Sequence, residues 1–410
     1  MAALTQSEGD RRRAGSPLEV LAAFARLGVT CFGGPIAHLG YFRAEFVERR
    51  RWLDEAAFAD LVGLCQFLPG PASSQTGFAI GLLRGGYLGG LAAWTGFTLP
   101  SAVLLLLFAY GAGGLAATAS GAGVLHGLKL VAVAIVAQAI WGMARSLCPD
   151  RKRASIATVA LILVLFAPTS IGQIAAIALG GVAGLFLCRP AAAVGAGVVP
   201  EPLVMPVSRG VGIGCLVLFA VLLLVAPLLR GAGMGIAVFD AFYRSGALVF
   251  GGGHVVLPLL RDAVVTPGWV SENSFLAGYG AAQAVPGPLF TFAAYLGAVI
   301  SGPLGGVVGG IIALFAIFLP GILLLMGTLP FWDALRARPQ AQAAMRGVNA
   351  AVVGLLGAAL YNPVWTSAVL RPADFALAVL GFVLLVVWRV PPLLVVAIGA
   401  LGGIGLGILG

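Results

Sequence analysis

Long apolar stretches without charged side chains constrain this chain more than any other feature. The stretch from Leu91 to Gly114, LAAWTGFTLPSAVLLLLFAYGAGG, carries no charge and exceeds the roughly 20 residues that a transmembrane helix needs. Of the 410 residues, 60% are hydrophobic and 10% are charged, whereas a soluble domain has about 25% charged residues. So few charges cannot cover a water-soluble particle of this size. The sequence therefore predicts an all-α integral membrane protein.

The second constraint is an internal repeat. The segment AFARLGVTCFGGP (residues 23–35) recurs as AFYRSGALVFGGG (residues 241–253), and QFLPGP (66–71) recurs as QAVPGP (283–288). Within the first segment Arg26 matches Arg244, and nearly the same separation relates three further pairs: Trp52 and Trp269, Pro100 and Pro320, and Gly127 and Gly347. Chance does not keep one register over so many residues, so the chain is predicted to contain two homologous halves.

Each half is expected to contain the same series of elements. One apolar stretch is interrupted at F-G-G, a charged amphipathic segment follows, and another apolar stretch is interrupted at P-G-P. About four transmembrane helices complete each half, near 87–111, 121–145, 154–169 and 171–188, and near 303–328, 343–362, 373–388 and 391–409. The expected organisation is a cytoplasmic N-terminal arm (1–16), a first repeat (17–190), a linker (191–209), one extra connecting transmembrane helix (210–230, centred on Val211 to Leu229) and a second repeat (235–410).

The arginines predict how the two halves are oriented. If the F-G-G and P-G-P stretches are re-entrant helical hairpins, Arg49 to Arg51 and most other arginines face the cytoplasm, as the positive-inside rule requires. If the broken stretches crossed fully, these three arginines would lie outside. In both cases the extra helix makes the second half an inverted-topology repeat of the first. The loop after Arg261 is then expected on the outer side.

Broken helices in paired, inverted repeats are typical of the substrate site of a secondary transporter. Each break frees backbone groups that hydrocarbon cannot satisfy, and a half-helix that starts after the break presents N–H donors to an anion. A packing kink would be enough to explain a single break. The F-G-G and P-G-P breaks both recur in both halves, which favours a binding site. The predicted substrate-binding residues at the breaks are Gly33, Gly34, Pro35, Gln66, Pro69, Gly70, Pro71, Ser73, Gly251, Gly252, Gly253, Gln283, Pro286, Gly287 and Pro288.

Cations within apolar stretches are further candidates for this site. Arg26 and Arg244 precede their F-G-G breaks, and an arginine at the membrane centre costs roughly 2.5–3.5 kcal/mol. The Arg26 side chain could extend to the cytoplasmic membrane surface. Because Arg244 belongs to the inverted half, its side chain would have to extend to the opposite surface. Lys129 and Arg346 add two cations one helix later, although Arg346 could be an ordinary helix-end residue. The acidic candidates for proton coupling or for counter-ions are Asp60, Glu19 and Asp240.

Several classes of function are disfavoured. The sequence has no G-x-x-x-x-G-K-[ST] loop, no H-E-x-x-H motif and no Ser/His/Asp arrangement within reach, so neither a nucleotide-driven pump nor an enzyme is predicted. The cysteines are scattered without C-x-x-C, and the three histidines lack metal-ligand spacing, so no metal and no cofactor are expected. The net charge of +9 comes from residues at segment ends, which is an orientation signal and does not indicate a nucleic-acid partner.

A family signature covers most of the chain. The run FGGPIAHLGYFRAEFVERRRWLDEAAFADLVGLCQFLPGPASSQTGFAIGLLRGGYLGG resembles the chromate ion transporter family, and FGGGHVVLPLL and QAVPGPLFTFAAYLG resemble the same domain again. The resemblance covers roughly 15–190 and 235–405. It implies a long-chain, two-domain chromate transporter of the bacterial cytoplasmic (inner) membrane, which confers chromate resistance by export, with sulfate as a look-alike. Gly253 stands where the first half has Pro35, so the two halves need not be equivalent.

The residues by themselves leave more than one function open. The favoured interpretation is an oxyanion exporter that binds its substrate at broken-helix termini near the midplane and is driven by the membrane potential, a proton gradient or both. The alternatives are a transporter or channel for another small anion such as sulfate, and a membrane-embedded enzyme or flippase acting on anionic lipid-linked substrates. The expected partners are the small oxyanion and membrane lipids, and a homodimer is the assembly considered.

Overall fold

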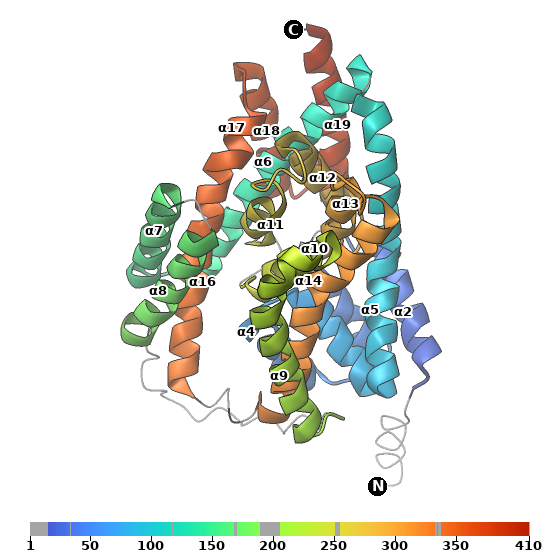
Figure 1. Cartoon of the computed structure of the whole chain (residues 1–410), viewed down its shortest axis with the longest axis vertical. Helices are drawn as coiled ribbons and strands as arrows, with labels where there is room; N and C mark the ends of the chain where they lie inside the picture. Colours follow the sequence, from blue (N-terminus) through green and yellow to red (C-terminus); the bar gives the residue numbers. More distant parts are fainter. Residues whose placement is uncertain are drawn as a thin grey trace.

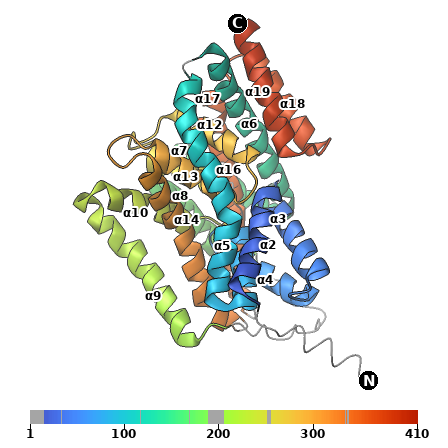
Figure 2. The same cartoon turned by 90° about the vertical axis from the view of Figure 1, so that its right-hand side faces the viewer.

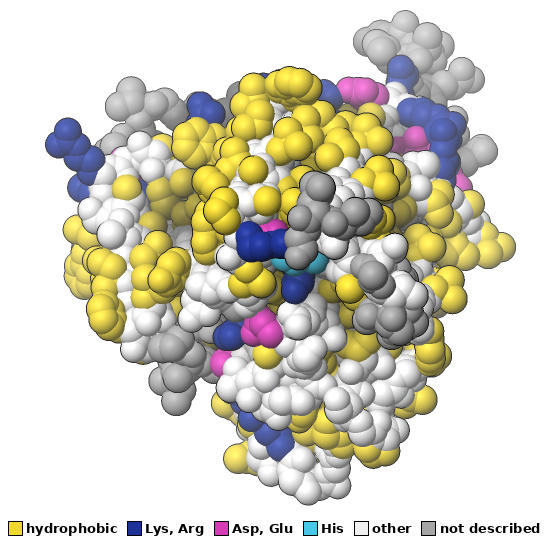
Figure 3. Space-filling view, turned by 90° about the horizontal axis from the view of Figure 1, so that it is seen from above, with side chains coloured by type: hydrophobic (Ala, Val, Ile, Leu, Met, Phe, Trp, Pro, Cys, Tyr) yellow, Lys and Arg dark blue, Asp and Glu magenta, His cyan; other side chains and the backbone are white. Residues whose placement is uncertain are grey.

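The fold is a bundle of helices elongated along one axis (Figure 1). The computed structural model describes residues 15–32, 34–116, 118–167, 170–188, 206–250, 255–332, 334 and 338–409. Across these residues the chain forms helices and no β-strand, which confirms the all-α prediction. Five helices are long and apolar enough to cross a membrane: 72–111, 120–147, 209–232, 307–331 and 339–368. Seen from above, hydrophobic side chains occupy much of the rim of the molecule (Figure 3), as a lipid-facing surface requires.

The helices of the first half agree with the predicted ranges. They are α2 (Pro17–Thr30), α3 (Gly34–Phe42), the π-helical η1 (Arg43–Arg49), α4 (Glu55–Phe67), α5 (Ala72–Ala116), α6 (Ala119–Leu147), α7 (Arg151–Phe166) and α8 (Ser170–Leu187). Helix α5 has two arms, because Gly85 and Gly86 have non-helical backbone angles. The expected helix 87–111 is the second arm of α5. The first arm follows the P-G-P sequence.

The second half begins after a connecting helix. That helix is α9 (Arg209–Val225), continued by the 3-10 turn η2 (Ala226–Ala232). It is followed by α10 (Met234–Ala247), α11 (Val256–Val264), α12 (Glu272–Ala284), η4 (Leu289–Thr291), α13 (Phe292–Val299), α14 (Val307–Thr328), η5 (Leu329–Phe331), α16 (Pro339–Ala359), η6 (Leu360–Trp365), α17 (Thr366–Ala368), α18 (Pro372–Val386) and α19 (Pro392–Leu409). The helix expected from residue 303 begins at Val307, since Gly302 and Gly306 adopt positive φ angles in the turn before it.

Equivalent residues start equivalent helices in the two halves. The side chain of Asp54 caps α4 by accepting a hydrogen bond from the amide of Ala57 at 2.8 Å. The side chain of Ser271 caps α12 in the same way, from the amide of Ser274 at 3.2 Å. Such caps pair amides that otherwise lack a helical partner. One residue later, Glu55 binds Arg43 at 2.8 Å, and Glu272 binds Arg261 at 2.9 Å.

The helices break where the sequence predicts. Helix α2 ends at Thr30 and α3 begins at Gly34, and α4 ends at Phe67 before α5 begins at Ala72. In the second half, the corresponding breaks separate α10 from α11 and α12 from η4. Helix α2 has 14 residues, or about 21 Å at 1.5 Å per residue. This is less than the roughly 30 Å of a hydrocarbon core, so α2 by itself is too short to cross one.

The two halves exchange their last helices. Helices α7 and α8 of the first half pack on α16 of the second half, whereas α18 and α19 pack on α6 of the first half. These groupings are visible in Figures 1 and 2. Glycines make both contacts close: a Cβ on Gly127 would lie 2.1 Å from the carbonyl oxygen of Gly399, and one on the equivalent Gly347 would lie 2.0 Å from that of Gly180. Small residues that allow close backbone approach are characteristic of helix packing in lipid.

The second arm of α5 and its repeat counterpart α14 lie side by side in antiparallel directions. The Trp94 ring is 5.7 Å from that of Phe318. Farther along α5, the side chain of Leu106 lies beside Gly310, and the hydroxyl of Tyr110 lies beside Gly306. Residue numbers therefore rise along one helix as they fall along the other. This pair forms one of the contacts between the two halves.

Candidate functional site

The four predicted breaks meet in two reciprocal pairs. The amide of Gly70, in the first P-G-P bend, donates a hydrogen bond of 2.7 Å to the carbonyl oxygen of Val249, which follows α10 at the second F-G-G break. The amide of Gly287, in the second P-G-P bend, donates a bond of 2.9 Å to the carbonyl oxygen of Cys31 at the first F-G-G break. The same bond is thus made twice, each time between halves. Backbone groups freed by one break are satisfied in part by the break of the other half.

Both central glycines are required by backbone angle and by space. Gly70 has a φ of 119° and Gly287 has a φ of 100°, in a region that side chains with a Cβ rarely adopt. A Cβ on Gly70 would lie 3.1 Å from the Cα of Gly321, and a Cβ on Gly287 would lie 2.8 Å from the Oγ of Ser101. The P-G-P bends are therefore held tightly against the long helices α14 and α5.

Buried polar side chains gather beside the first P-G-P bend. Ser73, Gln75 and Thr76, on the first turns of α5, are each at most 2% exposed. The Nε2 of Gln75 donates to the carbonyl oxygens of Pro69 at 3.1 Å and Gly321 at 2.9 Å. His38 of α3 is 1% exposed, and its Nδ1 lies 3.4 Å from the Oγ of Ser73. Polar groups are costly inside a membrane protein and mark functional sites there.

Several of these groups retain unused hydrogen-bonding capacity. Among the described residues, His38 Nε2, Gln75 Oε1 and Thr98 Oγ1 are buried without a hydrogen-bond partner. Thr98 lies on the second arm of α5, next to Phe97, whose ring is 5.2 Å from the His38 ring. Buried polar atoms in proteins are nearly always paired. Unpaired atoms that lie close to two helix breaks are suited to water or to a polar ligand.

The half-helices that start at the P-G-P bends add backbone donors. In α5 the amide of Gln75 is the first to bond within the helix, to the carbonyl oxygen of Pro71, so the preceding amides have no helical acceptor. In the second half, the amide of Thr291 bonds to Pro288 at the start of η4. The positive ends of helix dipoles and free N–H groups attract anions without a charged side chain.

The sequence analysis identified the bends but missed most of this polar cluster. Of its members, only Ser73 was predicted. His38, Gln75, Thr98 and Ser101 were not. A signal was present, because Ser73 to Thr76 form a run of four polar residues in an otherwise apolar helix. The second half does not repeat that run, so a comparison of the two halves did not reveal it.

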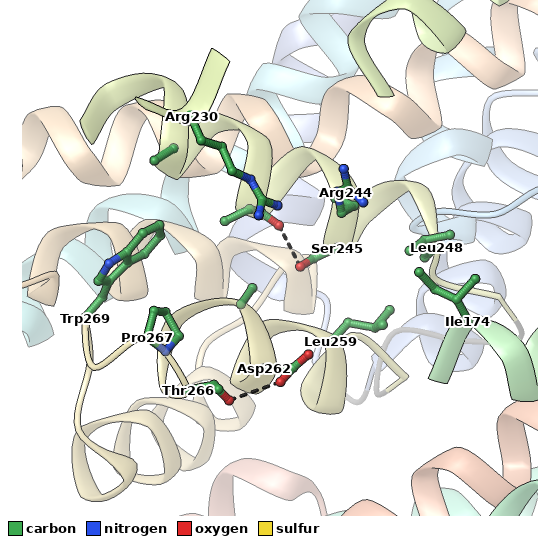
Figure 4. A pocket seen from close by; sticks show the side chains of 13 residues that line it. Ile174, Arg230, Arg244, Ser245, Leu248, Leu259, Asp262, Thr266, Pro267 and Trp269 are labelled. Carbon is green, nitrogen blue, oxygen red and sulfur yellow. Dashed lines mark hydrogen bonds between the residues drawn. The ribbon is translucent and has the colours of Figure 1, made fainter. Parts of the chain in front are cut away.

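Arg244 lines a separate cavity of about 620 Å³. In Figure 4, Arg230 and Arg244 lie on one side of this cavity, and Asp262, Thr266 and Pro267 lie on the other. The fully buried Asp240 pairs with Arg230 and lies 3.6 Å from the Nε of Arg244. One carboxylate thus faces two guanidinium groups on this side of the cavity, and the carboxylate of Asp262 lines the other side.

The remaining predicted cations lie elsewhere. Arg26 is exposed, and the described residues offer its side chain no ion pair. Lys129 donates to the Oδ1 of Asn273 at 3.1 Å. Arg346 donates to the carbonyl oxygen of Cys188 at 3.3 Å, in a second cavity. The structure therefore groups Arg244 with Arg230 and Asp240, and does not bring Lys129 or Arg346 into that group.

The other predicted residues fall into four groups. Gln66 is exposed, whereas the Nε2 of its counterpart Gln283 is buried without a partner among the described residues. Glu19 binds Arg84 at 3.3 Å, and Asp60 accepts a hydrogen bond from Trp332 at 3.0 Å. Pro69, Pro71, Pro286 and Pro288 flank the two central glycines, and Gly34 starts α3. Gly33, the side chain of Pro35, and Gly251, Gly252 and Gly253 lie outside the described residues.

Comparisons with known proteins agree with the residues that carry the repeat. A family model described as chromate transporter matches residues 18–185 and again residues 236–404. The chromate transport protein of Pseudomonas aeruginosa is 29% identical over 349 residues, which cover 83% of this chain and 79% of that protein. A probable chromate transport protein of Synechococcus elongatus is 27% identical over 82% of both chains. An uncharacterized transporter of Methanocaldococcus jannaschii is 23% identical over 85% of this chain and 84% of its own. No solved structure matches this chain.

Proposed function

Because this chain belongs to the chromate transporter family, we propose that it is a secondary transporter that exports chromate across the cytoplasmic membrane and binds the anion where its broken helices meet. The observation that carries the proposal is the reciprocal pair of bonds from Gly70 to Val249 and from Gly287 to Cys31. The family consists of transporters and not of enzymes, so the membrane-embedded enzyme is no longer an alternative.

The proposed binding chemistry needs few formal charges. Chromate is a tetrahedral oxyanion whose oxygens accept hydrogen bonds. The amides at the start of α5 and the hydroxyl of Thr98 can donate several such bonds. His38 can donate another in the tautomer that carries its hydrogen on Nε2. Donors fixed by the protein and shielded from water hold an anion more strongly than the same donors in water. A site without a buried arginine also leaves the anion free to leave again, as transport requires.

The proposed architecture is a pair of inverted repeats. The antiparallel contact of α5 with α14, the equivalent ion pairs Arg43–Glu55 and Arg261–Glu272, and the exchange of terminal helices support this proposal. In transporters with inverted repeats, the substrate site lies near the midplane between the repeats, and the repeats move against each other. The paired P-G-P bends lie at such an interface.

We propose that the cavity beside Arg244 is the outer vestibule of this pathway. Apart from Ile174, its lining residues belong to the second half and its connecting helix. The proposed inverted topology would put these segments on the outer side. Arg230 and Arg244, on the wall opposite Asp262, would lower the energy of a departing dianion on their side of the cavity. The cavity and the bends together would give the anion two successive sites of favourable potential.

The test is chromate flux in proteoliposomes. Vesicles with purified protein are loaded with chromate, and release is followed after dilution into chromate-free buffer, with protein-free vesicles as the control. Release should depend on the protein, saturate with internal chromate and be slowed by sulfate. Release no faster than from protein-free vesicles, under both signs of an imposed potential, would contradict the proposed function.

A further inference from the structure

A second cavity lies where the two halves exchange helices. It has a volume of about 470 Å³ and lies between the first turn of α7, the end of α8 and the side of α16. Its wall is rich in cations: the residues that line it are Asp150, Arg151, Lys152, Arg153, Leu187, Cys188 and Arg346. The proposed export of chromate does not use this cavity.

The charges in this cavity are not balanced within the described part of the chain. Asp150 is engaged by one neighbour, since its carboxylate accepts from the backbone amide of Arg153 at 2.9 Å and from its Nε at 2.6 Å. These bonds hold the pKa of Asp150 below its ordinary value. Within the described residues, Arg346 donates to a neutral acceptor, the carbonyl oxygen of Cys188. The described residues provide no ion pair for the side chains of Arg151 and Lys152.

The position of these cations favours a further anion besides the capping residue Asp150. Arg151, Lys152 and Arg153 form the first turn of α7, where the helix dipole is positive and favours negative charge. Cations there repel the dipole and one another. An anion at this place would interact favourably with both the side chains and the dipole.

The equivalent place in the other half contains an anion from the protein itself. His126 of α6 is the repeat counterpart of Arg346, and it faces the first turn of α18 as Arg346 faces α7. The Nε2 of His126 lies 2.8 Å from the Oδ1 of Asp374, a carboxylate that is fully buried. Its Oδ2 accepts bonds from the amides of Leu370 and Arg371 at 3.1 and 3.0 Å. On α7, Arg153 and its neighbours replace this carboxylate with positive charge.

The end of α6 indicates where the cavity lies relative to the membrane. Trp141 is 53% exposed, and the guanidinium of Arg145 lies 5.9 Å from the centre of its ring. Tryptophan and arginine side chains of this kind concentrate at membrane–water interfaces. Because Asp150 follows shortly after Arg145 in the chain, the cavity lies close to the level of lipid headgroups.

We propose that this cavity binds a phosphate-type oxyanion at the membrane surface, the chemistry shared by the headgroup of an anionic phospholipid and by free phosphate. Guanidinium groups bind phosphate oxygens in pairs, and basic pockets between transmembrane helices are suited to anionic headgroups. The bound group would connect α7 of the first half to α16 of the second. It would therefore stabilise the exchanged arrangement of helices.

Thermal unfolding of the full-length protein in neutral detergent tests this site. The melting temperature is measured with added phosphatidylglycerol, with phosphatidylcholine of the same acyl chains, and with sodium phosphate against sodium chloride at equal ionic strength. The test variant is Arg151→Gln with Arg346→Gln. The matched control is Arg209→Gln, an exposed arginine at the first residue of α9 that does not line the cavity.

We expect phosphatidylglycerol to raise the melting temperature of the wild type and of Arg209→Gln, with at least tenfold weaker apparent affinity in the double variant. Protection by phosphatidylglycerol alone identifies a lipid headgroup, and equal protection by sodium phosphate identifies the free anion. Equal protection of the double variant, or no protection of the wild type by either compound, would overturn the proposal. If the double variant does not fold, Lys152→Gln should still weaken the effect. No transported anion is involved, so this result is independent of the export assay.

Discussion

The amide of Gly70 lies 2.7 Å from the carbonyl oxygen of Val249, so that the bend at one helix break is fixed by a break in the other half of the chain. The pair formed by Gly287 and Cys31 repeats this relationship at 2.9 Å. Each bond ties a bend to a neighbour that is distant in sequence. The geometry of the candidate site therefore depends on the contact between the halves.

Replacing either bend glycine should damage both stability and transport. Alanine at Gly70 or Gly287 must adopt a positive φ, at a cost of roughly 1–2 kcal/mol, and its Cβ would press on Gly321 or Ser101. We expect a lower melting temperature and a loss of chromate release in both variants. Gly142→Ala is the matched control, because this helical position has open space around it and alanine favours a helix. An unchanged melting temperature in both Gly70→Ala and Gly287→Ala would show that the bends are not held as described.

Arg244→Gln should weaken chromate binding without preventing folding. The substitution keeps a polar side chain in the cavity and leaves Asp240 paired with Arg230, so no buried carboxylate loses its only partner. A hydrogen bond to a charged group contributes about 1.5–3 kcal/mol, which corresponds to roughly tenfold or more in affinity. The measurement is the external chromate concentration that slows release to half its rate, since Arg244 lines the proposed outer vestibule. Arg26→Gln should weaken chromate binding less than Arg244→Gln, since Arg26 is exposed. Equal losses of affinity would indicate that both arginines have the same role.

The sequence predicted the helices well because their signals are local. Apolar stretches gave the positions of α6, α7, α8, α18 and α19 to within a few residues, and F-G-G and P-G-P marked the breaks. What the sequence could not show is which half each helix contacts. The exchange of α8 and α19 between halves depends on glycine surfaces such as Gly180 and Gly399, and a small-residue surface does not specify its partner.

The candidate site was predicted less completely than the fold. The bends were predicted from proline and glycine, which fix backbone angles locally. His38, Gln75 and Thr98 were missed because their meeting depends on how α3 and both arms of α5 pack together. Conversely, Arg346 and Lys129 were grouped with the breaks because they are cations in apolar helices, a property that the structure also explains by contacts with Cys188 and Asn273.

The orientation of the halves can be tested by thiol labelling. In a variant without the native cysteines, Ala44→Cys and Thr266→Cys place single thiols on the exposed segments that follow α3 and α11. An impermeant thiol reagent applied to intact cells should label Cys at position 266 and not at position 44, since inversion puts these segments on opposite sides. Both should react in disrupted membranes. Equal labelling in intact cells would contradict inverted repeats.

The segment after α3 should lose stability in acid. Burial opposes ionisation of Glu45, but hydrogen bonds from Arg50 and Arg49 dominate and lower the pKa of Glu45. A carboxylate whose folded pKa lies below its unfolded value stabilises the fold above the unfolded pKa, near 4.5, and loses this contribution as pH falls through the folded pKa. Glu45→Gln should therefore lower the free energy of unfolding at pH 7 by about 1–2 kcal/mol, seen as a lower melting temperature. Below pH 4 the substitution should have a smaller effect on the melting temperature. Glu48→Gln, at an exposed ion pair with Arg43, is the control. A difference between wild type and Glu45→Gln that persists at low pH would rule out this origin.

Chromate release should depend on the membrane potential. A dianion gains about 4.6 kcal/mol by leaving a compartment that is 100 mV negative, at roughly 2.3 kcal/mol per charge, and each 1.36 kcal/mol is about tenfold. The potential alone can therefore maintain more than roughly a thousandfold gradient, and export needs no nucleotide. Uptake would instead require several coupled cations, yet Asp240 is paired with Arg230 and Glu19 with Arg84.

In proteoliposomes of known orientation, an interior-negative potassium diffusion potential should accelerate release and the reversed potential should slow it. Flux that ignores the sign of the potential and follows an imposed pH gradient would show electroneutral proton exchange instead. In that case Asp60→Asn should abolish the pH dependence, whereas under potential-driven export it should change the rate only modestly.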